Sequence, residues 1–164
     1  LARSSATAEG LDATFEVGDV RDLTFADEFH AVICLCQGGF GLLGGDDDAG
    51  IIGRVATAVR PGGAVALTAF SSYFALRWLE ENEHFDPQTG VLHETAQLRN
   101  EAGEEQPFDL WTTCFTAREL DLLARTAGLE VTGIHGVKPG QYRRAGPALE
   151  QPELLFLARK PLGR

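Results

Sequence analysis

The sequence has no methionine among its 164 residues and opens at Leu1. Because translation starts with methionine, these features predict that the chain is the later part of a longer product. Lysine is scarce as well: of the 14 basic residues, only Lys138 and Lys160 are lysines, and the others are arginines. This preference for arginine is typical of GC-rich bacterial genomes, and we therefore expect a bacterial source.

Cysteine is rare, and long apolar runs are absent. Cys34, Cys36 and Cys114 are an odd number of thiols, which argues against a disulfide framework and favours reduced cysteines in the core. Cys34 and Cys36 share one face of a predicted strand, but no His or Cys cluster completes a metal site. No run reaches the roughly 18 apolar residues of a membrane span, and the start resembles no signal peptide. We predict a cytoplasmic protein with no metal and no membrane partner.

Basic residues are outnumbered by acidic ones, 14 against 24, which gives a formal net charge of -10. Binding to a nucleic-acid backbone needs clustered Lys and Arg, so this balance argues against a nucleic-acid partner. The composition, 44% hydrophobic and 23% charged, is that of a globular domain. We expect a small-molecule substrate as the partner, and a possible second copy in a homodimer.

The stretch AVRPGGAVALTAF, residues 58–70, reads as the end of a helix followed by a buried strand. Pro61 cannot extend a helix, and Gly62 and Gly63 allow a tight exit from it. The apolar run that follows does not alternate with polar residues, which is typical of a parallel strand covered on both faces. Sheets of this kind usually bind a ligand at the carboxyl ends of their strands.

Helical and strand patterns alternate along the rest of the chain. A capping box, Thr116 with Glu119, opens the clearest helix, which ends at Gly128, and residues 46–60 form a second amphipathic helix. We also expect a helix ending at Gly10, a helix over residues 71–85, and strands over residues 13–17, 30–36, 63–70, 129–135 and 153–160. The predicted fold class is α/β: a Rossmann-like, mostly parallel sheet with helices on both faces, an antiparallel C-terminal strand and an inserted β-hairpin.

Residues 85–115 form the predicted β-hairpin insertion. DPQTG and NEAGEEQP are turn clusters, and the stretches VLHETAQLR and FDLWTTCF contain strand formers. The hairpin follows the exit of the 63–70 strand, where strand carboxyl ends define a ligand crevice. We therefore expect it to act as a cap that selects the substrate.

The sequence GFGLLG, residues 39–44, matches the G-x-G-x-x-G pattern of dinucleotide-binding turns. In such folds the pyrophosphate docks on the N-terminus of the next helix, where this chain has three aspartates at residues 46–48. These carboxylates would repel a phosphate, so an NADP-binding Rossmann domain is the less favoured interpretation. A tight turn at a strand exit, or a turn that lets the backbone approach a ligand without phosphates, also explains the glycines.

A resemblance to the class I S-adenosylmethionine-dependent methyltransferases is carried, in order, by FEVGDVRDLTF, FHAVICLCQGGFGLL, VRPGGAVALTAF, FTARELDLLARTAGLEV and PELLFLARK. The most specific pieces are Gly18 and Asp19 after a strand and the Pro61-Gly62-Gly63 turn. The resemblance covers nearly the whole chain except the hairpin. It implies that residues 1–164 are a partial methyltransferase domain whose cofactor is S-adenosyl-L-methionine and whose acceptor is a small molecule.

The same resemblance implies where the cofactor binds. In the family an acid after the third strand accepts a hydrogen bond from the adenine amino group, which corresponds to Asp19, and the next backbone N–H, that of Val20, faces the adenine. The loop after the fourth strand lies near the methionine moiety and the methyl group, which corresponds to Cys36, Gln37 and Gly38.

The family's glycine-rich loop and the acid after its second strand precede the part of the fold that this chain matches. The resemblance therefore implies that the chain by itself is inactive. It also leaves a second interpretation open, a non-catalytic remnant or interaction domain that keeps the fold and lacks the cofactor site.

No catalytic residue is assigned, because methyl transfer mainly needs alignment of nucleophile, methyl group and leaving sulfur, and a dedicated base is optional. If a base is used, the candidates near the 63–70 strand exit or on the hairpin are Tyr73, His84, Asp86 and His93. For each, a role in the surface or in hairpin stability is the competing interpretation. Two large aromatics flank the hairpin and either line a substrate pocket or seal the core: Trp78 and Trp111.

Overall fold

The computed structural model describes residues 1–36, 40–45, 47–100 and 103–163. Its helices are α1 (Ala2–Ala8), the short 3-10 helix η1 (Val20–Asp22), α2 (Asp48–Ala58), α3 (Ser72–Arg77) and α4 (Ala117–Thr126). Its strands are β1 (Phe29–Cys34), β2 (Val59–Ser71), β3 (Glu83–Asp86), β4 (Val91–Arg99), β5 (Glu105–Phe115), β6 (Glu130–Val137) and β7 (Glu153–Arg159). Among the described residues, no helix is long and apolar enough to cross a membrane.

The strands form one seven-stranded sheet centred on β2. Its order is β3-β4-β5-β2-β7-β6, and β1 also pairs with β2. β1 runs parallel to β2, with Cys34 opposite Leu67. β7 lies antiparallel between β2 and β6, so β6 runs in the same direction as β2. The predicted α/β class and the reversed C-terminal strand are confirmed.

The hydrophobic core lies between the sheet and the two longest helices. α2 contributes Ile51 and Ile52, which are almost completely buried, and α4 contributes Leu120. They pack on alternate residues of β2 and β7, such as Leu67 and Phe156, because successive side chains of a strand point to opposite faces. The predicted capping box opens α4: the Thr116 hydroxyl accepts from the Glu119 N–H, and the Glu119 carboxylate accepts from the Thr116 N–H.

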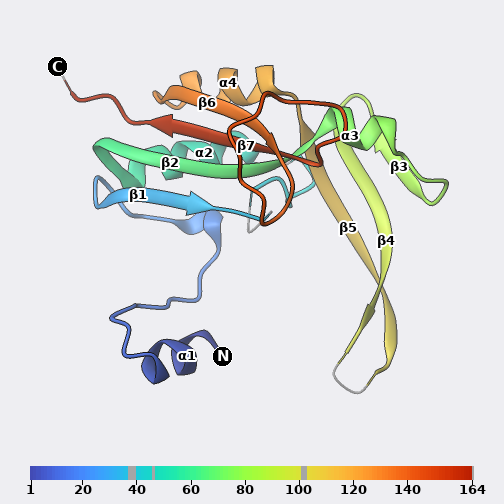
Figure 1. Cartoon of the computed structure of the whole chain (residues 1–164), viewed down its shortest axis with the longest axis horizontal. Coiled ribbons are helices and arrows are strands. Elements are labelled where there is room, and N and C mark those ends of the chain that lie inside the picture. The colour runs from blue at the N-terminus through green and yellow to red at the C-terminus, as the bar shows by residue number, and fades with distance from the viewer. Residues whose placement is uncertain (37–39, 46, 101–102, 164) are drawn as a thin grey trace.

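The helices α2 and α4 pack into this one cluster and therefore cover the same face of the sheet. On the other face Ile33 of β1 is 69% exposed, and the segment between β6 and β7, residues 138–152, passes across the sheet (Figure 1). The Gly136 N–H of β6 donates to the Ala145 carbonyl in this segment at 3.1 Å. We expected helices on both faces of the sheet. In the described part of the chain, α2 and α4 cover one face, and the β6–β7 segment lies over the other.

The strand predicted over residues 13–17 does not form. These residues have no regular structure, and Val17 is fully exposed. A strand needs a hydrogen-bonded neighbour and a covered face, and among the described residues β1 pairs with β2 alone. A stretch rich in strand-forming residues therefore forms no strand here, because no described strand pairs with it.

The helix predicted over residues 71–85 is also largely wrong. α3 ends at Arg77, and residues 83–86 form β3 instead. Phe85 packs against a small cluster of Ala75, Leu92 and Cys114, so pairing with β4 gives this aromatic a buried place that a continued helix would not. Tertiary contacts override the local helical pattern.

The Pro-Gly-Gly stretch lies inside β2 rather than before it. α2 ends at Ala58, and β2 begins at Val59. The pairing with β1 slips here, because Phe29 is opposite Val59 while Ala31 is opposite Ala64, which is the mark of a bulge. Gly62 has a φ of +78°, which favours glycine.

The hairpin is continuous with the main sheet at its base and extends away from it at its tip (Figure 1). β4 and β5 pair from Val91 opposite Thr113 to Arg99 opposite Glu105, and β3 adds a third strand beside β4. At its carboxyl end β5 pairs in parallel with β2, with Cys114 opposite Phe70. The base of the hairpin therefore lies at the carboxyl end of β2.

Candidate functional site

The carboxyl ends of β1, β2 and β5 meet at one edge of the sheet. β1 and β2 are parallel, and β5 joins β2 in parallel where β1 stops. Because β7 is antiparallel to β2, its first residue, Glu153, lies at the same edge, opposite Phe70. In open α/β sheets this edge is where ligands bind.

Asp19 lies just before η1 and caps it. Its Oδ1 accepts hydrogen bonds from the N–H of Arg21 at 2.8 Å and from Arg21 Nε at 2.9 Å, and its Oδ2 accepts from Arg21 Nη2 at 2.6 Å. These bonds, the side-chain bond first, lower the pKa of Asp19 to about 2. Val20 begins η1 and its side chain packs against the helix-side core. Asp19 is therefore a solvent-exposed carboxylate, ionised at neutral pH and held by its own turn.

The resemblance places Cys36, Gln37 and Gly38 near the methyl group of the cofactor. The structure describes Cys36, whereas Gln37 and Gly38 lie outside the described residues. Cys36 has a φ of +55°, which is uncommon for a residue with a side chain. Its Sγ is 2.9 Å from the hydroxyl of Tyr142, and either atom can donate the hydrogen bond. Tyr142 belongs to the β6–β7 segment, so this contact joins two loops that are 106 residues apart in sequence.

Residues 40–45, which follow β1 in sequence, pack against the base of the hairpin. Phe40 is buried and stacks on Phe115 of β5, with ring centroids 4.9 Å apart. The Thr113 N–H donates to the Gly41 carbonyl at 2.7 Å, and the Gly45 N–H donates to the Thr113 hydroxyl at 2.9 Å. The loop and β5 therefore form one packed unit at the carboxyl edge.

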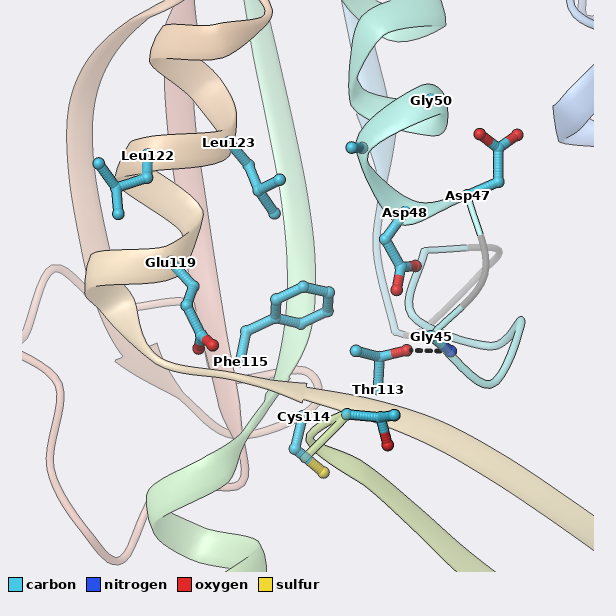
Figure 2. A pocket seen from close by; sticks show the side chains of 12 residues that line it. Gly45, Asp47, Asp48, Gly50, Thr113, Cys114, Phe115, Glu119, Leu122 and Leu123 are labelled. Atoms are coloured by element: carbon cyan, nitrogen blue, oxygen red, sulfur yellow. Dashed lines mark hydrogen bonds between the residues drawn. The ribbon is translucent and has the colours of Figure 1, made fainter. Parts of the chain in front are cut away.

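A cavity of about 440 Å³ lies beside this unit, between the first turns of α2 and α4. Figure 2 shows Asp47, Asp48 and Glu119 around an apolar floor that includes Phe115 and Leu123. Two of the three carboxylates already serve local structure: Asp47 pairs with Arg54 at 2.9 Å, and Glu119 belongs to the α4 capping box. Small-molecule sites commonly have such a volume and a mostly apolar lining.

Acidic residues occupy the start of α2, where the dinucleotide interpretation would place a pyrophosphate. Asp47 is its N-cap, and Asp48 lies in its first turn and is buried, with 7% of its surface exposed. Both carboxylates oppose a bound phosphate at this helix N-terminus. The geometry therefore disfavours an NADP site here.

The four candidate bases lie on α3 and on the hairpin. Asp86 is a turn residue, because its carboxylate accepts from the Gln88 N–H at 2.9 Å and from the Thr89 hydroxyl at 2.7 Å. His84 is opposite His93 in the β3–β4 pair, and Tyr73 lies in α3.

His93 belongs to a cluster on one face of the hairpin. Its ring stacks on Trp111 with centroids 4.8 Å apart, and its Nε2 is 3.2 Å from Asp109 Oδ1. The Thr95 hydroxyl donates to the same oxygen at 2.8 Å, and these bonds, that from Thr95 first, lower the pKa of Asp109. His93 therefore contacts two residues of β5 across the hairpin, which agrees with the hairpin-stabilising interpretation.

The two flanking tryptophans are half exposed. Trp111 is 49% exposed and Trp78 is 55% exposed, so neither seals the core. Arg77 lies over the Trp78 ring at 5.7 Å from its centroid. Of the cysteines, Cys34 packs against the main core, and burial raises the pKa of Cys114 to about 12, which makes that thiol inert.

Sequence reasoning missed two residues of this edge, Tyr142 and Glu153. Tyr142 lies in a long irregular segment with no pattern that marks it. Glu153 carries a usable signal, since it is a charged residue at the start of the apolar run ELLFLA, which the pattern identifies as a buried strand. An acid at such a position has to be explained by a partner or by a ligand.

The sequence matches no protein-family model and no curated protein. Its structure, however, resembles solved S-adenosylmethionine-dependent methyltransferases. A methyltransferase of that description from Clostridium acetobutylicum superposes with a TM-score of 0.75 at 13% identity, covering 99% of this chain and 70% of that one. The chain has the fold of the S-adenosylmethionine-dependent methyltransferases.

Two further structures with this methyltransferase fold are informative. The CcbJ methyltransferase from Streptomyces caelestis gives a TM-score of 0.69 at 20% identity over 88% of this chain, which spans 62% of that enzyme's length. The 1,6-didemethyltoxoflavin-N1-methyltransferase of Burkholderia thailandensis, solved with S-adenosylhomocysteine, gives 0.60 at 18% identity, covering 98% of this chain and 56% of that one. At these identities the likeness concerns the fold.

Proposed function

We propose that this chain takes part in S-adenosylmethionine-dependent methyl transfer to a small-molecule acceptor. The observation that carries the proposal is the methyltransferase fold with an ionised carboxylate, Asp19, where the resemblance expects the adenine contact. One observation supports a small acceptor: a neighbouring structure is named as a methyltransferase of 1,6-didemethyltoxoflavin.

The described residues fit part of the cofactor. A carboxylate oxygen can accept two hydrogen bonds, and Asp19 Oδ2 accepts one from Arg21, so it retains a place for an amino-group donor. The cofactor would supply a methyl group on a positively charged sulfur, which leaves as a neutral thioether. The chain's part is to hold this group and the acceptor in line and to exclude water. The packing of Phe40 and Gly41 against Phe115 and Thr113 of the hairpin base gives residues 40–45 a fixed position for that task.

A second candidate is a non-catalytic domain with the same fold. The observation that favours it is that Asp19 already has a structural role. Its carboxylate accepts three hydrogen bonds from Arg21, and these bonds form the turn into η1. On this reading the carboxylate is a capping group and binds no ligand.

Calorimetry with S-adenosylmethionine separates the two candidates. In the protein as its natural gene encodes it, Asp19→Ala should weaken cofactor binding by about 1.5–3 kcal/mol, the scale of a hydrogen bond to a charged group. Asp22→Ala, which removes an exposed acid from the same turn, is the matched control and should leave the affinity unchanged.

Arg21→Ala completes the design. If Asp19 contacts the cofactor, this variant keeps the affinity, because the carboxylate remains. If the turn alone matters, Arg21→Ala and Asp19→Ala weaken binding equally. Absence of any binding by the natural protein rejects the methyltransferase proposal and supports the non-catalytic domain.

A further inference from the structure

Glu153 is a buried acid on β7, a strand that has a neighbouring strand on each side. It begins β7, lies between Phe70 of β2 and Val137 of β6, and is 3% exposed. Leu154 and Phe156 point into the helix-side core, so the alternation of side chains places Glu153 on the opposite face. It therefore lies at the carboxyl edge of β2, on the side of the sheet that the β6–β7 segment crosses.

The carboxylate of Glu153 lacks partners in the part of the chain that the structure describes. Its Oε2 is fully buried and accepts no hydrogen bond there. No Lys, Arg or His nitrogen of these residues lies within 4.0 Å of it, whereas Asp27 pairs with Lys160 at 2.6 Å. A buried carboxylate without a donor or a cation costs several kcal/mol, so its presence calls for a reason.

Tyr142 of the β6–β7 segment reaches the same edge of the sheet through its hydrogen bond with Cys36. Three effects raise the pKa of Tyr142: its hydrogen bond with Cys36 first, then burial, and more weakly the charges of Cys36 and of Glu153. Cys36 follows the carboxyl end of β1 by two residues, so the hydroxyl 2.9 Å from its Sγ lies at the edge of the sheet where Glu153 begins β7. Loop, tyrosine and buried acid form one polar group at the edge where the proposed function places the methyl group.

We propose that Glu153, assisted by the Tyr142 hydroxyl, binds the amino group of the methyl acceptor, so that the acceptor is an amine. This inference rests on the proposed function and names its substrate class. An ammonium group supplies both things that Glu153 lacks, an N–H donor and a positive charge, whereas an alcohol supplies the donor alone. The net charge of -10 also favours a cationic ligand over an anionic one.

The bound amine must lose a proton before it can react, and Glu153 can take it. The ammonium N–H bond breaks, the proton moves to the carboxylate, and the nitrogen keeps the electron pair. That electron pair would bond to the methyl group that the cofactor supplies when it is bound, and the electrons of the C–S bond would stay with the sulfur. Burial raises the pKa of Glu153, which favours its holding of the proton until release to solvent.

The test follows the side-chain carboxyl carbon of Glu153 by NMR in the natural protein during titration with butylammonium chloride. We expect a saturable shift of this resonance, which is assigned by its loss in Glu153→Gln. Tetramethylammonium chloride, a cation without N–H, should cause no such shift. Tyr142→Phe should weaken butylammonium binding about threefold to tenfold, the scale of one neutral hydrogen bond.

Glu130 provides the matched control, because it begins the neighbouring strand β6 and is exposed. Absence of a saturable shift at Glu153, or an equal shift with tetramethylammonium or at Glu130, overturns the amine site. Calorimetry with S-adenosylmethionine tests the proposed function separately, since Glu153→Gln should bind the cofactor within about twofold of the wild type. A protein that binds butylammonium but not the cofactor keeps the amine site and loses the methyltransferase proposal.

Discussion

At the scale of single residues, two carboxylates of the same edge differ because their surroundings differ. Asp19 is exposed and receives three hydrogen bonds from Arg21, which lower its pKa to about 2. Glu153 is buried without a hydrogen bond at Oε2 among the described residues, and desolvation raises its pKa. Asp19 is therefore an anion at neutral pH, whereas burial favours the protonated form of Glu153.

The raised pKa of Glu153 makes a prediction about stability. The folded protein holds this proton to higher pH than the unfolded chain does, so the free energy of unfolding should fall as pH rises above about 4.5, the unfolded value, and level off above the folded pKa. Glu153→Gln removes this loss, and its stability relative to the wild type should increase over the same range. Urea denaturation at a series of pH values measures the difference.

Glu130→Gln, at an exposed position, should follow the wild type at every pH. A Glu153→Gln variant whose relative stability is constant with pH would show that the acid is solvated in the folded protein. If Glu153→Gln is more stable than the wild type, Glu153 lowers the stability of the fold. A destabilising acid is easily replaced unless it serves a function, so this result would support a functional role for Glu153.

At the scale of elements, short side-chain contacts decide where helices start and where loops are fixed. α4 begins at a capping box in which the Glu119 N–H donates to the Thr116 hydroxyl at 3.2 Å. In the loop after β1, by contrast, Phe40 and Gly41 contact residues that are distant in sequence, Phe115 and Thr113 of β5. The first contact lies within four residues of sequence, whereas the second depends on the folded hairpin base.

Thr116→Ala tests the cap. The substitution leaves the Glu119 N–H without its acceptor at the start of α4, and we expect a loss of about 1 kcal/mol in the free energy of unfolding. Thr126→Ala, at an exposed position in the last turn of the same helix, should change stability by less than about 0.5 kcal/mol. Chemical denaturation compares the two, and equal losses would mean that the cap contributes nothing specific.

At the scale of the whole molecule, the hairpin combines two roles in one segment. Its base belongs to the fold, because Phe115 and Leu92 are buried and Cys114 pairs with β2. Its distal half is exposed in the described residues and extends away from the sheet (Figure 1). Removal of all of residues 85–115 would therefore damage the core, and a test of the cap must spare the base.

A shortened hairpin meets this condition. Thr95 is opposite Asp109, so a two-residue Asn-Gly turn in place of residues 96–108 should close β4 onto β5 and keep the Thr95–Asp109 hydrogen bond. We expect the cofactor affinity of the natural protein to stay within about twofold and methylation of its acceptor to be lost. A variant that refolds and methylates with unaltered efficiency would assign the tip to packing or assembly.

The sequence by itself determined the features that depend on local chemistry. Thr116 and Glu119 predict the start of α4 because a capping box is closed within one turn, and the apolar run after Gly63 predicts a buried strand because its period is local too. The order of these elements was sufficient to predict an α/β sheet with a reversed last strand. It also predicted a strand just before Asp19, and residues 13–17 form no strand in the structure.

Tertiary structure decided what depends on partners distant in sequence. Residues 13–17 have the composition of a strand and lack a neighbour to pair with, while residues 83–86 look helical and pair with β4 because Phe85 finds a buried place there. The contact of Cys36 with Tyr142 and the burial of Glu153 arise only when β7 inserts between β2 and β6. Pairing and burial are properties of two or more segments at once, and for that physical reason no single stretch of sequence reveals them.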